Sequence, residues 1–187
     1  MRPQKVEDKV LLQGLMSVLR SKGYDGASLN DLAASSGLQK ASLYHRFPGG
    51  KKEITAAVLQ FANEWVQKHV YTPLTDETIT PSKRLTQVLA NIDALYAGGE
   101  DACILRALSM DSGIELFGSQ IKESMQLWID GFTTVGEALG FTKKEAQSKA
   151  HQVLISVQGS LVVCKGLNSR VLFESTLKSI KNMYKKG

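Results

Sequence analysis

The sequence predicts an all-α protein in which an N-terminal three-helix helix-turn-helix domain is joined by a long helix to a C-terminal helical bundle. Apolar residues recur three and four positions apart along most of the chain, and glycines or prolines separate these runs. A length of 187 residues suffices for two unequal domains. We therefore expect one domain over residues 1–66, the linking helix included, and a second over residues 67–187.

The first predicted helix completes the N-terminal domain. Its apolar residues recur at helical spacing and end at the glycine-containing stretch 22–26. They are Val6, Val10, Leu11, Leu15, Val18 and Leu19. Three helices of this size bury too little surface to be stable alone, so this domain depends on the rest of the chain.

Two short helices joined by a tight turn are predicted next. Ser28 and Asp31 have the spacing of a capping box, which satisfies the open amide groups at a helix start. Gly37 provides the left-handed conformation that ends the first short helix. Leu43 and Phe47 then recur at helical spacing, so the second short helix buries a narrow stripe against the first.

The outer face of the second short helix is polar and suits the major groove of DNA, where side chains at a helix start reach base edges. The candidates for base contacts are Gln39, Lys40, Ala41, Ser42, Tyr44 and His45. The candidates for phosphate contacts are Ser28, Lys51 and Lys52. The alternative is a helical protein-interaction module without DNA binding, because two amphipathic helices with a glycine turn also occur in ordinary bundles.

The positive charge of the chain is concentrated around this motif. Residues 1–52 contain nine Lys or Arg and four Asp or Glu, whereas the remaining residues contain fourteen of each. An electrostatic surface that docks on phosphates requires such segregation. A membrane-binding patch would need a wide apolar face flanked by lysines, which these short helices do not offer.

Residues 43–47 read Leu-Tyr-His-Arg-Phe and are followed by a Pro-Gly-Gly turn and by Lys-Lys-Glu-Ile. This pattern resembles the TetR family of bacterial one-component repressors, over about Val6 to Leu59. Gln39 stands where the family usually has serine or threonine, Ala41 where it has glycine, and the turn is one residue longer. The doubled glycine is similar to the lincomycin- and flavonoid-responsive repressors of the family.

The resemblance implies a ligand-responsive repressor that binds a palindromic double-stranded DNA operator as a dimer and is released by a small effector. The effector would be apolar or aromatic and would bind the C-terminal bundle. The long helix of residues 51–69 would transmit the change to the DNA-reading part. Effector and operator would oppose each other through a reciprocal coupling of about 1–3 kcal/mol.

The rest of the chain reads as further helices. Residues 71–81 contain two prolines and four threonines, so we expect a non-helical connector there. Helical periodicity then predicts helices over 82–96, 103–110, 116–139, 143–165 and 170–184. Gly98, Gly113 and Gly140 are expected to end three of them.

Catalysis and metal binding are not indicated. Cys103 and Cys164 are far apart in apolar surroundings, and the three histidines show no metal spacing. No set of nucleophile, base and donors is visible, and no glycine-rich loop follows a strand. We therefore expect a protein that is not an enzyme and needs no cofactor. No secretory segment and no membrane-spanning run is visible, so we expect it to be cytoplasmic.

An apolar effector pocket is expected between residues 96 and 132, where large apolar side chains are dense and charges are few. The candidates are Tyr96, Met110, Phe117, Met125, Trp128 and Phe132. The alternative is that these residues are ordinary core, since helical bundles bury aromatic residues and methionines anyway.

A homodimer is expected through the last two helices, because residues 153–164 are apolar on nearly every side. Small residues at its centre would allow two backbones to approach at a twofold axis. The interface candidates are Val153, Val157, Gly159, Ser160, Leu161, Cys164, Leu177 and Ile180. The alternative is a monomer in which this helix is the central one of its own bundle.

Overall fold

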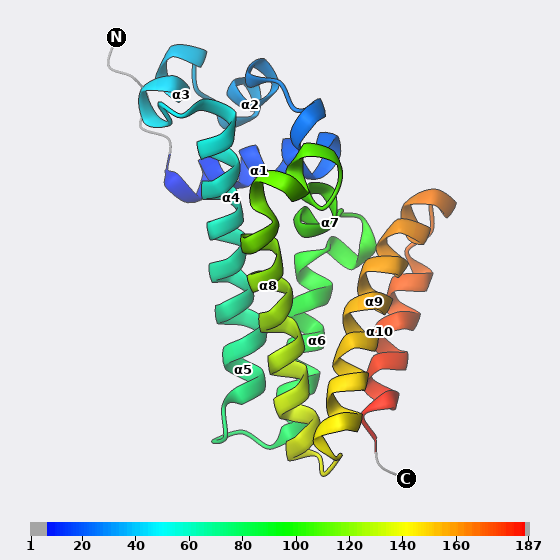
Figure 1. Ribbon diagram of the computed structural model, residues 1–187. Helices are drawn as coiled ribbons and strands as arrows, with labels where there is room; N and C mark the ends of the chain where they lie inside the picture. Colours follow the sequence, from blue (N-terminus) through cyan, green and yellow to red (C-terminus); the bar gives the residue numbers. More distant parts are fainter. Residues whose placement is uncertain (1–6, 186–187) are drawn as a thin grey trace. The chain divides into compact units, whose positions relative to one another are not determined.

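The computed structural model describes residues 7–185, which contain only helices and turns (Figure 1). The all-α prediction is therefore confirmed. These residues form two compact units. The first comprises the chain up to Ala62 together with residues Ile104–Ile121, and the second comprises Asn63–Cys103 and the chain from Lys122 onward. The functional division at residue 66 stays a prediction.

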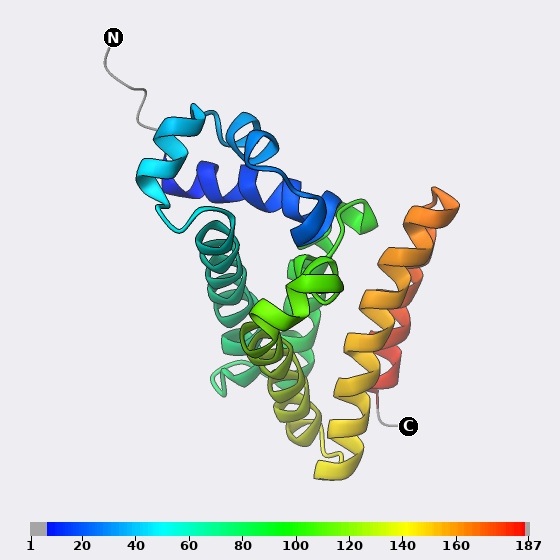
Figure 2. The ribbon, with the colours of Figure 1, turned by 45° about the horizontal axis from the view of Figure 1, so that its top comes forward.

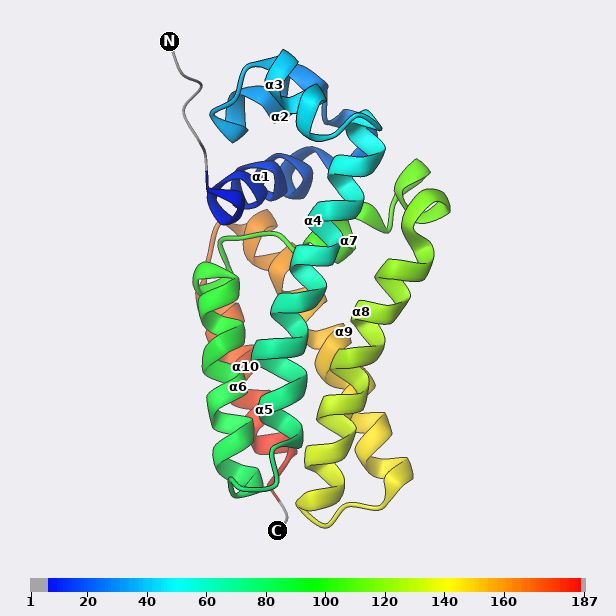
Figure 3. The same ribbon diagram turned by 90° about the vertical axis from the view of Figure 1, so that its left-hand side faces the viewer.

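The first unit is built on a three-helix arrangement at its N-terminal end. Its helices are α1 (Asp8–Gly26), α2 (Leu29–Ser36), α3 (Lys40–Arg46), the start of α4 (Gly50–Val66), α7 (Ile104–Leu108) and the first turns of α8 (Asp111–Ala138). Helix α1 packs against α2 and α7, and α2 packs against α3. Helices α2 and α3 lie on the same side of α1 (Figures 2 and 3).

The buried face of α1 follows the predicted periodicity except at Val10 and, in part, at Val18, which is half-buried. Leu11, Leu15 and Leu19 are almost fully buried, as the spacing predicted. Val10 is exposed, so its predicted place in the core is wrong. The three leucines define the inner face of the helix, and Val10 lies outside that face. Val6 lies outside the described residues.

The second unit is a bundle of longer helices. It contains the π-helical turn η1 (Gln67–Tyr71), α5 (Thr72–Thr75), α6 (Pro81–Leu95), the 3₁₀ turn η2 (Ala97–Gly99), α9 (Lys143–Leu167), α10 (Val171–Met183) and the later turns of α8. Helices α9 and α10 lie side by side (Figure 1), and α10 also packs against α6. Thr142 begins α9 with the predicted capping box.

Two expectations about turns need correction. The connector predicted over residues 71–81 contains the helix α5, which continues directly from η1. Pro73 cannot donate to the carbonyl oxygen of His69, which instead accepts a hydrogen bond from Asn91 Nδ2 at 2.8 Å. Gly113 does not end a helix but lies inside the first turn of α8. A Cβ atom at this glycine would lie 2.5 Å from the carbonyl oxygen of Leu108, so close packing explains its presence.

No helix within residues 7–185 is both long enough and apolar enough to cross a membrane. The same range contains no group of three or more His, Cys, Asp and Glu side chains placed to hold a metal ion. Cys103 and Cys164 are free thiols buried in the second unit.

Candidate nucleic-acid interface

Helix α2 is held at both ends by the residues that the sequence singled out. Ser28 and Asp31 form a complete capping box, and Gly37 adopts the left-handed conformation with φ 68°. Lys22 of α1 donates to Asp31 Oδ1 at 2.6 Å. The pKa of Asp31 lies well below its usual range, because the carboxylate accepts hydrogen bonds from Lys22 and then from Ser28. The helix that precedes α3 is therefore fixed by local contacts.

Helix α3 presents a polar face to solvent. Leu43 and Phe47 are buried against the unit, as predicted. The exposed residues of this helix and its N-cap are Gln39, Lys40, Ala41, Tyr44, His45 and Arg46, and Ser42 is half-buried. Tyr44 is 42% exposed although it is aromatic, so its ring is free to contact a partner. A helix of this kind can enter a major groove with its N-terminal residues on base edges.

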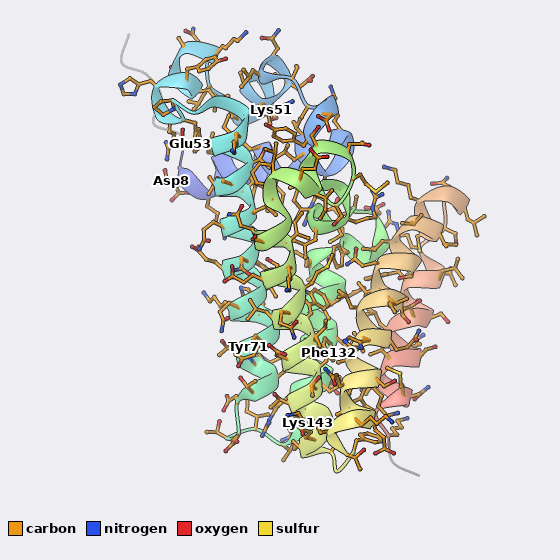
Figure 4. The ribbon with its side chains drawn as sticks, viewed as in Figure 1. Asp8, Lys51, Glu53, Tyr71, Phe132 and Lys143 are labelled. Atoms are coloured by element: carbon orange, nitrogen blue, oxygen red, sulfur yellow. The ribbon has the colours of Figure 1, made fainter. Side chains whose placement is uncertain are left out.

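The turn between α3 and α4 leads from the exposed face of α3 to the start of α4. The N-terminus of a helix attracts anions. Gly50 has φ +64°, which accounts for the glycine at this position. Glu53 Oε2 accepts a hydrogen bond from Gly49 N at 2.7 Å and caps the start of α4. Figure 4 shows Lys51 and Glu53 at this end of the helix. Lys52 is exposed there, so it can meet a phosphate.

Two of the three predicted phosphate contacts have partners within the chain. The Ser28 hydroxyl accepts from Asp31 N and donates to Asp31 Oδ2 at 2.6 Å. Lys51 Nζ lies 4.5 Å from the centroid of the Tyr24 ring, a cation–π contact. Lys52 is therefore the predicted residue whose side chain is most open to a phosphate.

Sequence reasoning left Arg46 out of the site. Arg46 Nη2 forms an ion pair with Asp8 Oδ1, which connects the end of α3 to the first turn of α1. The pair joins residues 38 positions apart, and no periodicity within either helix indicates it. The positive charge of Arg46 nevertheless lies on the exposed side of α3, where a phosphate can compete for it.

The predicted effector residues divide between the two units. Tyr96, Trp128 and Phe132 are buried in the second unit, where Trp128 and Phe132 stack with ring centroids 6.2 Å apart. Met125 is half-buried in the same unit. Met110 is exposed and Phe117 is buried, and both belong to the first unit.

The predicted dimer residues lie on two different faces of α9 and α10. Val153, Val157, Leu161, Cys164 and Ile180 are buried inside the single chain, whereas Gly159 is exposed and Ser160 and Leu177 are half-buried. A second apolar stripe on these helices is exposed. It consists of Ile155, Val162, Val163, Leu167, Val171 and Leu172.

In sequence, the chain is similar to known bacterial transcriptional regulators. Residues 11–58 match the model for bacterial regulatory proteins of the tetR family. An uncharacterized HTH-type transcriptional regulator from Lactococcus lactis is 24% identical, over 94% of this chain and 92% of that protein. The HTH-type transcriptional regulator LmrA of Bacillus subtilis is also 24% identical, but over 49% of this chain and 48% of its own length.

Solved structures show the same fold. A TetR transcriptional regulator from Legionella pneumophila has a TM-score of 0.81 at 19% sequence identity, over 99% of this chain and 100% of that chain. The regulatory protein TetR from Rhodobacter sphaeroides has a TM-score of 0.79 at 15% identity, over 96% and 99%. The predicted architecture of a helix-turn-helix domain followed by a helical domain is therefore confirmed.

Proposed function

We propose that this chain, a helix-turn-helix transcriptional regulator of the TetR family, represses transcription by binding a palindromic DNA operator as a dimer. The family consists of regulators and not of enzymes, as the sequence predicted. The observation that carries the proposal is the exposed, mostly polar face of α3, which is held in place by the buried Leu43 and Phe47. A related protein from a Mycobacterium, 23% identical over 89% of this chain, is described as the transcriptional repressor DhaR.

In this proposal α3 contacts the base edges of DNA, and the start of α4 contacts its phosphate backbone. Gln39, Lys40 and Ala41 stand at the N-terminal end of α3, which reaches deepest into a groove. Ser42, Tyr44 and His45 follow on the same helix, and Lys52 meets a phosphate. Ser28 and Lys51 contribute through the geometry of α2 and α4, since their side chains have partners within the chain.

The test is selection of bound fragments from genomic DNA, followed by anisotropy titrations on the selected operator at several salt concentrations. Lys52→Ala should weaken binding to all sequences and reduce the salt dependence by about one phosphate contact. Tyr44→Ala should weaken operator binding more than binding to unrelated DNA. Lys83→Ala removes an exposed lysine of α6 and is the matched control. A protein that selects no DNA would support the helical interaction module.

The effector is proposed to be a small apolar or aromatic molecule bound in the second unit, near Tyr96, Met125, Trp128 and Phe132. The apolar and aromatic side chains gathered there support the proposal, because pockets for such molecules are lined mainly by residues of these types. Met110 and Phe117 belong to the first unit and are assigned to the effector only by their place in the sequence. The doubled glycine at residues 49–50 further suggests the lincomycin- and flavonoid-responsive subgroup.

The chain contains two tryptophans, so Trp65→Phe leaves Trp128 as the sole tryptophan reporter. Titrating this variant with a panel of apolar aromatic compounds should change its fluorescence with at least one of them. The same compound should release the variant from its operator. If the fluorescence stays constant across the panel and every complex with DNA persists, the effector proposal is wrong.

The dimer is proposed to form through the exposed stripe of α9 and α10. Six large apolar side chains are exposed on these two helices, and exposed apolar patches often mark a contact with a partner. A Cβ atom added at Gly159 or Gly166 would have no heavy atom within 4 Å, so a second backbone can approach α9 closely there. A dimer also places two recognition helices on the two half-sites of a palindrome. It therefore distinguishes DNA sequences better than one short helix does.

A further inference from the structure

The last turn of α1, residues Gly23, Tyr24 and Asp25, contacts three other helices of the first unit, and we name it the α1 corner. Gly23 is its contact with α7. This residue has φ +67°, and a Cβ atom there would lie 3.3 Å from the carbonyl oxygen of Ala107. A side chain would therefore be strained and crowded at this position. The α1 corner rests directly on the backbone of α7.

Asp25 holds the start of α8. Its Oδ2 accepts a hydrogen bond from Ser112 N at 3.0 Å, which satisfies one of the open amides in the first turn of that helix. The negative charge also suits the positive end of the helix dipole. Asp111, the first residue of α8, has φ +49°, a conformation that costs free energy for a residue other than glycine. This strained start therefore depends on outside contacts, and Asp25 provides one.

Tyr24 connects α8 to the start of α4. Its ring packs edge-on against Phe117 of α8, with centroids 5.4 Å apart and an interplanar angle of 66°. Lys51 Nζ lies over the same ring, 4.5 Å from its centroid. Lys51 is the second residue of α4 and precedes Lys52, the proposed phosphate contact. One ring thus touches both the second turn of α8 and the first turn of α4.

We propose that Tyr24 and Asp25 are positioning residues for DNA binding, which link the conformation of α8 to the placement of the first turn of α4. The linkage can reach the second unit through the backbone, because α8 is one continuous helix whose residues 111–121 belong to the first unit and whose later residues belong to the second. In this proposal α8 transmits the conformational change in addition to the long helix α4. The inference rests on the proposed function, since it concerns how DNA binding is regulated.

The chain offers variants that separate chemistry from shape. Asp25→Ala removes the acceptor for Ser112 N, whereas Asp25→Asn keeps an acceptor oxygen of similar reach. Tyr24→Leu removes the ring that Lys51 and Phe117 contact, whereas Tyr24→Phe keeps it. Asp93→Asn neutralises an exposed carboxylate of α6 in the second unit and is the matched control.

The experiment is amide hydrogen exchange of the full chain, followed by mass spectrometry, with and without the operator selected from genomic DNA. Coupling between two sites is reciprocal, so operator binding should slow exchange along α8 in the wild type, including its residues 122–138. Asp25→Ala and Tyr24→Leu should lose this protection over 122–138 while α3 is still protected by DNA. Their operator affinity should fall about fivefold or more. Asp25→Asn, Tyr24→Phe and Asp93→Asn should behave as the wild type.

Each outcome decides one claim. If the wild type binds no DNA, the proposed function fails and this inference fails with it. If the wild type binds operator but α8 is not protected, or if Asp25→Ala and Tyr24→Leu keep the protection of 122–138, the inference alone is overturned. Circular dichroism checks that the variants are folded. If Asp25→Ala does not fold, the comparison of Tyr24→Leu with Tyr24→Phe tests the inference. If the aromatic ring is required, only Tyr24→Leu loses the protection of residues 122–138.

Discussion

At the scale of single residues, Tyr184 shows how a side chain near the end of the chain stabilises the second unit. Its hydroxyl donates to the carbonyl oxygen of Phe132 at 3.1 Å, and its ring lies 6.1 Å from the Phe132 ring. Burial of the phenol raises the pKa of Tyr184 above that of an exposed tyrosine. The folded state therefore favours the protonated phenol.

This shift predicts a pH dependence with a definite sign. The stabilisation from Tyr184 is complete below about pH 10, where the unfolded chain is still protonated, and is lost as the pH rises above it. Tyr184→Phe should cost about 1 kcal/mol at neutral pH and flatten the alkaline fall in the free energy of unfolding. Urea titrations from pH 8 to 11 measure both effects. Tyr44→Phe changes an exposed phenol and should keep the alkaline fall.

Residues of the candidate interface were predictable to the extent that their signals are local. The burial of Leu43 and Phe47 and the capping box of Ser28 follow from spacings of three or four, so the sequence predicted the exposed face of α3. The Lys51–Tyr24 contact joins two helices, and the Arg46–Asp8 pair spans 38 positions. Such pairs depend on how helices pack, which no local pattern encodes.

At the scale of helices, Gly14 sets the distance between α1 and α2. A Cβ atom at Gly14 would lie 2.2 Å from the carbonyl oxygen of Ser35, which is backbone and cannot rotate away. Gly14→Ala should therefore destabilise the protein by at least about 2 kcal/mol, because α1 and α2 must separate. Thermal unfolding measures the loss, and DNA binding should weaken as α2 shifts.

Gly26 provides the comparison for this prediction. It is also in α1, but an added Cβ atom would meet only the Lys22 side chain at an ordinary 3.5 Å. Gly26→Ala should be neutral or stabilise the protein by up to about 1 kcal/mol. Equal losses for both alanine variants would show that close packing is not the reason for Gly14. Sequence periodicity located α1 but gave no sign of which glycine its partner approaches.

At the scale of the whole molecule, the two apolar stripes of α9 explain why the sequence looked apolar on every side. One stripe fills the core of the second unit, with Val157 fully buried, and the other is exposed, with Ile155 64% and Val162 51% accessible. From the sequence alone the two stripes were indistinguishable, because each repeats at helical spacing. The proposed dimer surface therefore moves from the buried residues to the exposed ones.

The two stripes predict different failures. Ile155→Glu or Val162→Glu should give a folded monomer with much weaker operator binding, because the charge lies on the proposed contact between copies. Val157→Glu should instead unfold the second unit, since it buries an unpaired charge. Light scattering and circular dichroism distinguish the cases. A wild type that is monomeric at micromolar concentration, or a Val162→Glu variant that stays dimeric, contradicts this assignment.

Two of the three boundaries between the compact units fall inside helices, between Ala62 and Asn63 in α4 and between Ile121 and Lys122 in α8, and the third lies between Cys103 and Ile104, where α7 begins. Exchanging the DNA-reading part with that of a relative therefore requires three splices, and the two within α4 and α8 must preserve the helical rotation of about 100° per residue. Residues 104–121 must be transplanted together with the N-terminal segment. A chimaera joined at a single point after α4 would pair α1 with a foreign α7 and leave the cap of α8 without its matching partner.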